Sequence, residues 1–288
     1  MENIKHQEAA EPEEKSFFKV IVHSFFIIPF LIAVFCALLF AGMHLLTREN
    51  RSAYDYLEDV KTGGLTKRWQ GAFELSKILA NPKLLPDEER FYNELTSAYR
   101  QSLHDDVRVR QYLALAMGRT EKPIFFNVLT ENIADEKEEN LYTVIYALGM
   151  LKDTRATDVL IKFLDHQDSR IRSLTVVALG NLSDPNSIES IKKLLYDSEA
   201  NVQWGAAISL ASMNDTSGKE TILKLLNRNY LSSFPEVDTQ EQTQLILKTI
   251  EVSDVFISDP IVAQALQELS QNDPNMNIRS AALAKLKK

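Results

Sequence analysis

The 288-residue sequence contains a single cysteine, Cys36, and that cysteine lies inside an apolar run. A disulfide within the chain and a zinc site built on cysteine pairs are therefore excluded. Glycine and proline are also scarce, at nine each, and few segments alternate apolar with polar residues. These shortages favour helices over β-sheet throughout the chain.

Positive charge and catalytic motifs are scarce as well. The net charge is −8 and the isoelectric point is about 5.3, whereas a protein that grips nucleic acid needs a basic face. No two of the five histidines lie four residues apart, as a helical zinc-hydrolase motif requires, and KTGGLTK at 61–67 lacks the spacing of a phosphate-binding loop. We therefore predict no nucleic-acid partner, no catalytic residues, no cofactor and no metal, and hence a protein that is not an enzyme.

One uncharged apolar run, FFIIPFLIAVFCALLFAGM at 25–43, is long enough to cross a bilayer as a helix. A cleaved signal peptide is the alternative, but its apolar core usually spans only about 7–15 residues and ends at small side chains. Met43-His44-Leu45 makes a poor cleavage site. We therefore predict an uncleaved transmembrane helix over 17–46, preceded by a short acidic tail at 1–16.

Small side chains recur within this helix at every fourth residue: Ala33, Ala37 and Ala41. That spacing places them on one face, where a second membrane helix could pack closely. The alternative is chance, because alanine is common in such helices.

Charge near the helix gives the orientation. Arginine and lysine are more numerous after the helix than before it, which favours a cytoplasmic C-terminal part and a single-pass protein of the inner (cytoplasmic) membrane.

A repeat of 31 residues organises the rest of the chain. ALGMLKD at Ala147–Asp153 returns as ALGNLSD at Ala178–Asp184. Four ladders of residues share this interval: Gly118, Gly149, Gly180 and Ala211; Asp153, Asp184 and Asp215; Leu129, Leu160, Ile191 and Ile222; and Ile133, Leu164, Leu195 and Leu226. Such self-similarity indicates a solenoid.

Each unit is predicted to hold two helices. Apolar spacing gives one helix in ATDVLIKFLD at 156–165 and another in RIRSLTVVALGNLS at 170–183, with Asp168 or Ser169 as the cap between them. Asp184-Pro185 ends the unit and starts the next one. Each recurring glycine destabilises its helix by about 1 kcal/mol relative to alanine. We therefore expect it to allow close packing of a neighbouring helix.

The motif DSRIRSLTVVALGNLSD and its variants resemble HEAT repeats, specifically the short HEAT-like repeats of the phycobilisome lyase type. Arg110 and Arg172 match the family arginine, whereas Leu141 and Gln203 depart from it, so a charge ladder along the array would be broken. The resemblance implies an all-α protein. It predicts a right-handed α-solenoid of six or seven helix pairs over 67–288, after a juxtamembrane helix and linker over 47–66.

The repeat is interrupted near its C-terminal end, where about eight residues are inserted within NRNYLSSFPEVD at Asn227–Asp238. Tyr230, Leu231 and Phe234 make this insertion apolar. Apolar residues in a surface loop suggest a docking site for a protein partner. The alternative, that the three side chains fold back on the solenoid, is weighed equally.

The resemblance implies a binding role, because such arrays present a long curved surface and supply no chemistry of their own. We predict a non-catalytic scaffold or accessory subunit of a membrane protein complex, which binds protein partners through its solenoid and its membrane helix. Two alternatives stay open. One is a lyase or chaperone-like module that handles a bound chromophore or cofactor, and the other is an adaptor that recruits cytosolic clients. Deoxyhypusine hydroxylases, which are HEAT-type iron enzymes, use His-Glu dipeptides, and this sequence has none.

Overall fold

The computed structural model describes residues 23–46, 51–131 and 133–287, and every regular element in those ranges is helical. The chain divides into two compact units, residues 1–51 and 52–288. The predicted acidic tail at 1–16 lies outside the described residues.

The first unit contains a π-helix, His23–Ile27, followed by α2, Ile28–Leu46. Within the described residues one stretch, Phe25–Met43, is long and apolar enough to cross a membrane, and none of it is buried. A core helix of a soluble protein would bury most of these side chains. Pro29 lies in the first turn of α2, directly after the π-helix.

The second unit consists of seven helix pairs. Its α-helices are α3 (Ala53–Thr62), α4 (Leu65–Ile78), α5 (Glu89–Gln101), α6 (Val107–Arg119), α7 (Phe126–Thr130), α8 (Glu138–Leu151), α9 (Thr157–Ile161), α10 (Ser169–Leu182), α11 (Ile188–Lys193), α12 (Ala200–Ser212), α13 (Lys219–Leu225), α14 (Arg228–Leu231), α15 (Thr239–Val252), α16 (Pro260–Asn272) and α17 (Met276–Leu286). Short 3₁₀ turns lie between them at Pro82–Leu84, Ser102–His104, Pro123–Phe125, Ile133–Asp135, Thr154–Ala156, Pro185–Ser187, Leu194–Tyr196 and Ser253–Phe256. The prediction of an α-solenoid of six or seven pairs is confirmed.

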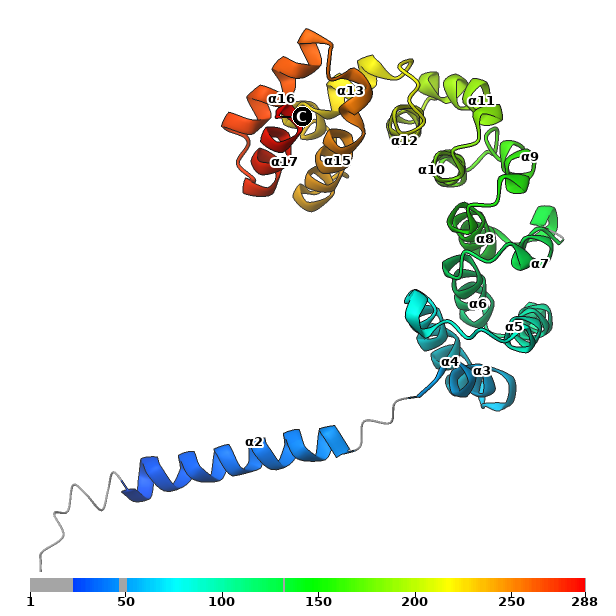
Figure 1. Cartoon of the computed structure of the whole chain (residues 1–288), viewed down its shortest axis with the longest axis vertical. Helices are drawn as coiled ribbons and strands as arrows, with labels where there is room; N and C mark the ends of the chain where they lie inside the picture. Colours follow the sequence, from blue (N-terminus) through cyan, green and yellow to red (C-terminus); the bar gives the residue numbers. More distant parts are fainter. Residues whose placement is uncertain (1–22, 47–50, 132, 288) are drawn as a thin grey trace, which may run out of the picture. The chain divides into compact units, whose positions relative to one another are not determined.

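The helix pairs form two curved rows (Figure 1). The helices α4, α6, α8, α10 and α12 follow one another along the inner side and are called the inner helices below. The helices α5, α7, α9 and α11 lie along the outer side. The helix α3 lies in the segment 47–66, assigned from the sequence to a juxtamembrane helix and linker. It packs on α4 as the first helix of a pair, and the compact unit begins at Ser52.

Aspartates begin many of the helices by a shared device. Asp168 accepts the backbone N–H of Arg170 at 2.8 Å and also binds the guanidinium of the same residue. The arginine, together with the hydroxyl of Tyr142, holds the pKa of Asp168 well below its usual range. Asp106 repeats the arrangement with Arg108, which lowers its pKa to about 2. The cap predicted at Asp168 is therefore confirmed.

The glycine ladder permits close packing of the inner helices. A Cβ added to Gly149 would lie 2.8 Å from the Cα of Ala178 on the next inner helix. One added to Gly118 would lie 2.7 Å from the Cα of Ala147. No real Cβ tolerates such distances, so any larger residue would force neighbouring inner helices apart. The predicted packing role of these glycines is confirmed.

Arg172 joins two neighbouring repeats. Its Nη1 donates to the carbonyl oxygens of His166 and Gln167 at 2.9 and 3.1 Å, just after the preceding outer helix. Its Nε and Nη2 bind the two carboxylate oxygens of Asp197, in the next repeat, at 2.8 and 2.7 Å. The guanidinium lowers the pKa of Asp197. We call this contact, from a family arginine to an acid one repeat later, the arginine staple.

The arginine staple is not continuous. Arg110 makes it to Glu136, with Nε 2.9 Å from the carboxylate. Leu141 holds the family position in α8, where it is buried and uncharged. Gln203 holds it in α12 and reaches only the carbonyl oxygen of Asp197, at 2.6 Å. The predicted break in the charge ladder is confirmed.

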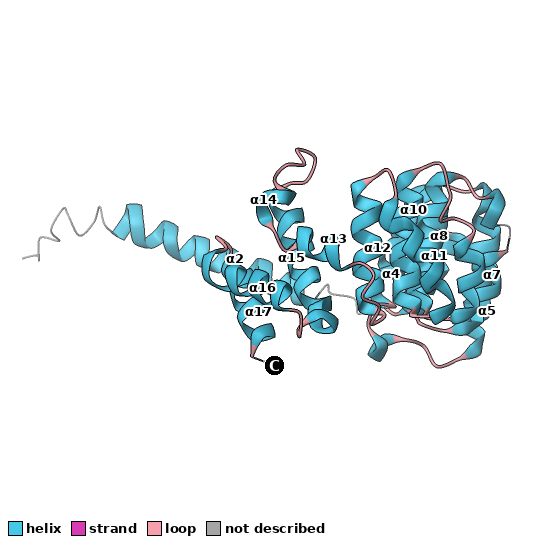
Figure 2. Ribbon diagram, turned by 90° about the horizontal axis from the view of Figure 1, so that it is seen from above, coloured by secondary structure: helices cyan, strands magenta, loops and turns pink. Residues whose placement is uncertain are grey.

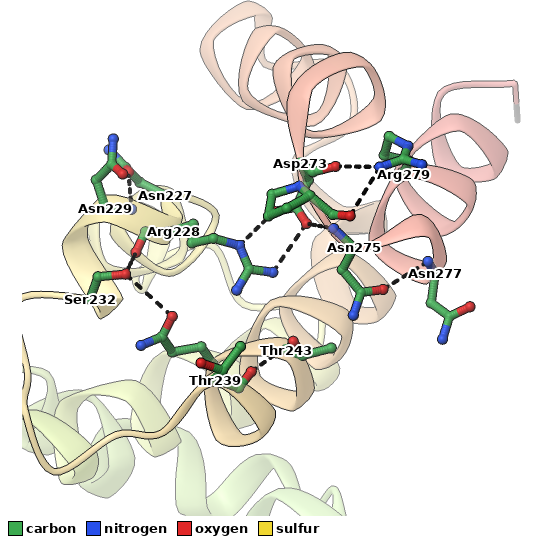
Figure 3. Close-up of polar contacts among 12 residues, drawn as sticks. Asn227, Arg228, Asn229, Ser232, Thr239, Thr243, Asp273, Asn275, Asn277 and Arg279 are labelled. Atoms are coloured by element: carbon green, nitrogen blue, oxygen red, sulfur yellow. Dashed lines mark hydrogen bonds and ion pairs between the residues drawn. The ribbon is translucent and has the colours of Figure 1, made fainter.

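An arginine from the inserted segment replaces the staple farther along the chain. Gln242 holds the family position in α15, and its amide donates to the carbonyl oxygen of Val237 in its own repeat. Arg228 of α14 instead reaches Asp273, between α16 and α17, with Nε and Nη2 2.9 and 3.1 Å from the carboxylate oxygens (Figure 3). Arg279 then donates to the carbonyl oxygen of Asp273 at 2.6 Å (Figure 3). The insertion therefore connects the last helix pair to the rest of the array.

Candidate partner-binding groove

A ladder of apolar side chains faces solvent along the inner helices. Leu115, Tyr146, Val177 and Ile208 follow one another at intervals of 31 residues, one each on α6, α8, α10 and α12. Tyr146 and Val177 are 42% and 39% exposed, and Leu115 and Ile208 are half-buried. We call these four residues the inner ladder. A regular exposed apolar row of this kind is typical of a contact surface for another protein.

The inner ladder leads into a groove of about 1120 Å³ between α10, α12 and α15. Three helices contribute apolar side chains to it, with Val177 on α10, Ile208 on α12 and Leu245 on α15. Because the groove lies where the 31-residue period is interrupted, we call it the period-break groove. Its size is that of a site for several side chains or for a small molecule.

Three carboxylates, Glu236, Asp238 and Glu241, line the mouth of the period-break groove. Asp238 is held in place because it caps α15, accepting the N–H groups of Gln240 and Glu241 at 2.7 and 2.8 Å. Glu241 completes the capping box by accepting the N–H of Asp238 at 3.2 Å. The one cation in the lining, Lys248, pairs with Glu251 at 2.9 Å, so the mouth is acidic.

The groove lies where the hydrophobic core divides into two clusters. One core cluster extends from α3 to α12, and a second begins at Trp204 of α12 and includes α13 to α17. The loop between α14 and α15 stands out from the array (Figure 2) and contributes Glu236 and Asp238 to the groove. The helix α12 contributes to both clusters and contacts α15 within the second one, beside the groove.

The three apolar residues predicted as a docking site lie against this second cluster. Leu231 is completely buried. Tyr230 and Phe234 are half-buried and form an aromatic cluster with Trp204, with ring centroids 6.3 and 4.9 Å from the indole. The indole Nε1 donates to the hydroxyl of Tyr230 at 3.3 Å. Of the two alternatives drawn from the sequence, this geometry favours folding back, and docking by the accessible parts of Tyr230 and Phe234 stays a prediction.

One glycine deepens the groove. Gly205 of α12 lines it, whereas the residues at the same place in the three preceding inner helices are Tyr112, Thr143 and Leu174. A Cβ added to Gly205 would have no neighbour closer than 3.7 Å, the Cγ1 of Val176. Packing therefore does not demand a glycine here. Its effect is to leave space open to solvent.

The other predicted positions lie elsewhere. Ala33, Ala37 and Ala41 are exposed on α2, four residues apart, and their role in packing against a membrane partner stays a prediction. In the ranges that the structure describes, no three histidine, cysteine, aspartate or glutamate side chains lie close enough together to hold a metal ion.

Comparison with known proteins identifies the repeat. Residues 93–179 and 157–232 match the HEAT-repeat family. The chain is similar to the structure of the complex of CpcE and CpcF of phycocyanin lyase from Nostoc sp. PCC7120, with 15% identity, coverage of 84% of this chain and 96% of that one, and a TM-score of 0.56. No curated protein matches the sequence. At this identity the likeness to the lyase complex is one of fold.

Two other solved structures are less similar. An engineered protein shares 17% identity, covers 82% of this chain and 95% of its own, and has a TM-score of 0.38. Human deoxyhypusine hydroxylase, solved with glycerol, shares 14% identity, with coverage of 82% and 83% and a TM-score of 0.34.

Proposed function

Because residues 93–232 match HEAT repeats, we propose that the chain is a non-catalytic, membrane-anchored scaffold or accessory subunit of a membrane protein complex. The solenoid would hold a soluble part of a partner on its inner helices. The helix α2 would span the inner (cytoplasmic) membrane, leaving the solenoid on the cytoplasmic side.

The observation that carries the proposal is the inner ladder and the groove to which it leads. Burial of apolar surface stabilises association by about 25 cal/mol per Å². An apolar side chain that is at least partly exposed on each of four successive inner helices therefore supplies what a partner surface needs. The fully exposed apolar helix supports membrane attachment, because its length matches the hydrocarbon core.

Purification of the full chain from its native membrane in mild detergent tests the scaffold function. We expect integral membrane proteins to co-purify in a fixed ratio. Tyr146→Glu together with Val177→Glu should release the partner, because two charges would be placed in an apolar interface. The matched control is Tyr196→Glu, since Tyr196 is 88% exposed but lies in an outer turn. A lone monomer, or equal retention by both variants, would contradict the proposal.

The same purification separates a scaffold from an adaptor. Recovery of soluble clients without any membrane partner would favour recruitment to the membrane. Protease treatment of right-side-out and inverted membrane vesicles tests the orientation. We expect cleavage of the solenoid only in inverted vesicles, and cleavage in right-side-out vesicles would place it on the other side.

A second candidate function is a module that handles a bound chromophore or cofactor. The observation that favours it is the fold shared with the phycocyanin lyase complex, together with a groove slightly larger than most small-molecule sites. Visible absorbance and mass spectrometry of the freshly purified protein test this function. A stoichiometric chromophore that Gly205→Leu displaces would favour it over the scaffold.

A further inference from the structure

The period-break groove has features that select among possible partners. We infer that it binds an amphipathic helix of a partner protein, with leucine-like side chains on one face and lysine or arginine on the other. This inference rests on the proposed scaffold function and names the segment that the solenoid would hold.

The apolar lining fits a helix better than an extended strand. Val177, Ile208 and Leu245 stand on three helices, and packed helices lie about 8–10 Å apart. Apolar residues seven positions apart on a bound helix are separated by about 10.5 Å, so they would match successive walls. The walls offer side chains only, because their backbone groups are bonded within their own helices. An extended segment would therefore bury unpaired backbone N–H and C=O groups, whereas a helix pairs its own.

The charge of the mouth selects a cationic helix. Glu236, Asp238 and Glu241 are exposed, and the cap of α15 fixes the last two in position. Carboxylates that are already held in place lose little side-chain freedom when a lysine or arginine approaches. An anionic helix would meet like charge at the same point, which is unfavourable.

The space next to Gly205 completes the fit. A leucine holds the equivalent place in α10, Leu174, where it is half-buried. Gly205→Leu should occupy the groove in the same way without disturbing α12, because the first added carbon has no contact shorter than 3.7 Å. We therefore expect Gly205→Leu to fill the groove while the array stays folded.

The test uses the full chain in nanodiscs of zwitterionic lipid and a labelled synthetic 18-residue helix with leucine on one face and lysine on the other. A peptide with glutamate in place of lysine, and one with serine in place of leucine, are the controls, and the signal from empty nanodiscs is subtracted. We expect fluorescence anisotropy to show saturable binding of the leucine–lysine peptide alone. Binding should weaken as salt is raised, because the attraction is partly between exposed charges.

Two variants locate the site. Glu236→Gln with Glu241→Gln keeps the cap but removes two charges, and should weaken binding by roughly 2- to 20-fold. Removal of two carboxylates outside the groove, Glu89→Gln with Glu220→Gln, should not. Gly205→Leu should weaken binding at least about 10-fold, as expected for an apolar site that is lost, whereas the smaller Gly205→Ala should weaken it less.

Equal affinity in Gly205→Leu and Gly205→Ala, or equal losses in the two glutamine pairs, would overturn the inference. The result is separate from the scaffold test. Co-purified subunits that stay bound to Gly205→Leu would support the scaffold and refute a helix in the groove. Specific peptide binding by a protein that purifies without partners would instead support a helix in the groove and contradict the scaffold function.

Discussion

Two glycines on the inner helices α8 and α12 should respond to alanine with opposite signs. Gly205 lies inside α12, and an added Cβ would make only ordinary contacts, at 3.7 Å or more. Alanine there loses less backbone freedom on folding and favours helix, so we expect about 0.4–1 kcal/mol of stabilisation. Gly149 lies inside α8, and its Cβ would lie 2.8 Å from both Cα and Cβ of Ala178. The backbone of α10 cannot yield cheaply, so Gly149→Ala should destabilise by about 1–3 kcal/mol.

Thermal unfolding of the full chain in detergent, followed by far-ultraviolet circular dichroism and by tryptophan fluorescence, measures both changes. For a unit of this size, 1 kcal/mol corresponds to about 2–4 °C. Gly205→Ala should therefore raise the melting temperature by about 1–4 °C, and Gly149→Ala should lower it by about 2–12 °C. Destabilisation by Gly205→Ala would show that α10 and α12 lie closer than described. An unchanged melting temperature in Gly149→Ala would remove the packing explanation of the glycine ladder.

Four further perturbations test the array and its anchor. Arg172→Met leaves the carboxylate of Asp197 without its guanidinium, so it should lower the free energy of unfolding by about 2–4 kcal/mol, and the loss should shrink when Asp197→Asn is added in a double-mutant cycle. Because the pKa of Asp197 is lowered in the folded state, its contribution is present above about pH 4 and is lost as the pH falls through the lowered value. The acid limb of a stability–pH curve should accordingly be flatter in Asp197→Asn than in the wild type, and parallel curves would contradict this. Arg228→Ala leaves a carboxylate that is 1% exposed, at Asp273, and should speed hydrogen exchange in α16 and α17 while α4 to α10 keep wild-type rates. Ala37→Leu should loosen a membrane partner during detergent washes if the Ala33, Ala37 and Ala41 face is a contact, and Leu38→Ala, on a different face, should not.

The repeat was predictable from the sequence because its signal is local and recurs. The glycine at Gly149, the turn at Asp184 and the cap at Asp168 each depend on neighbours within one repeat or the next. The inner ladder recurs at the same 31-residue interval, yet buried and exposed positions share that interval. Sequence alone therefore does not separate Tyr146, which is exposed, from the buried Leu148 two residues later.

The groove was not predictable in the same way, because it depends on where α15 lies after the insertion. The apolar residues of the insertion suggested a docking loop. In the structure Leu231 fills the core of its own array, and the groove lies between α10, α12 and α15. One signal was present in the sequence: Gly205 is a helical glycine that does not fall on the glycine ladder, so its role had to differ from that of Gly180.

The inserted segment has two physical effects that must be separated in any experiment. Its loop supplies Glu236 to the mouth of the groove, while α14 supplies Leu231 to the core and Arg228 to Asp273. Because stability in a solenoid is a sum of contacts between neighbours, deletion of the whole segment would weaken the attachment of the last helix pair as well as reshape the groove. A loss of binding after such a deletion would then have two causes. Gly205→Leu avoids this coupling, since it fills the groove from α12 and leaves Arg228 in contact with Asp273. The insertion is therefore better interpreted as a segment that connects two parts of one array. The groove is the space beside that segment.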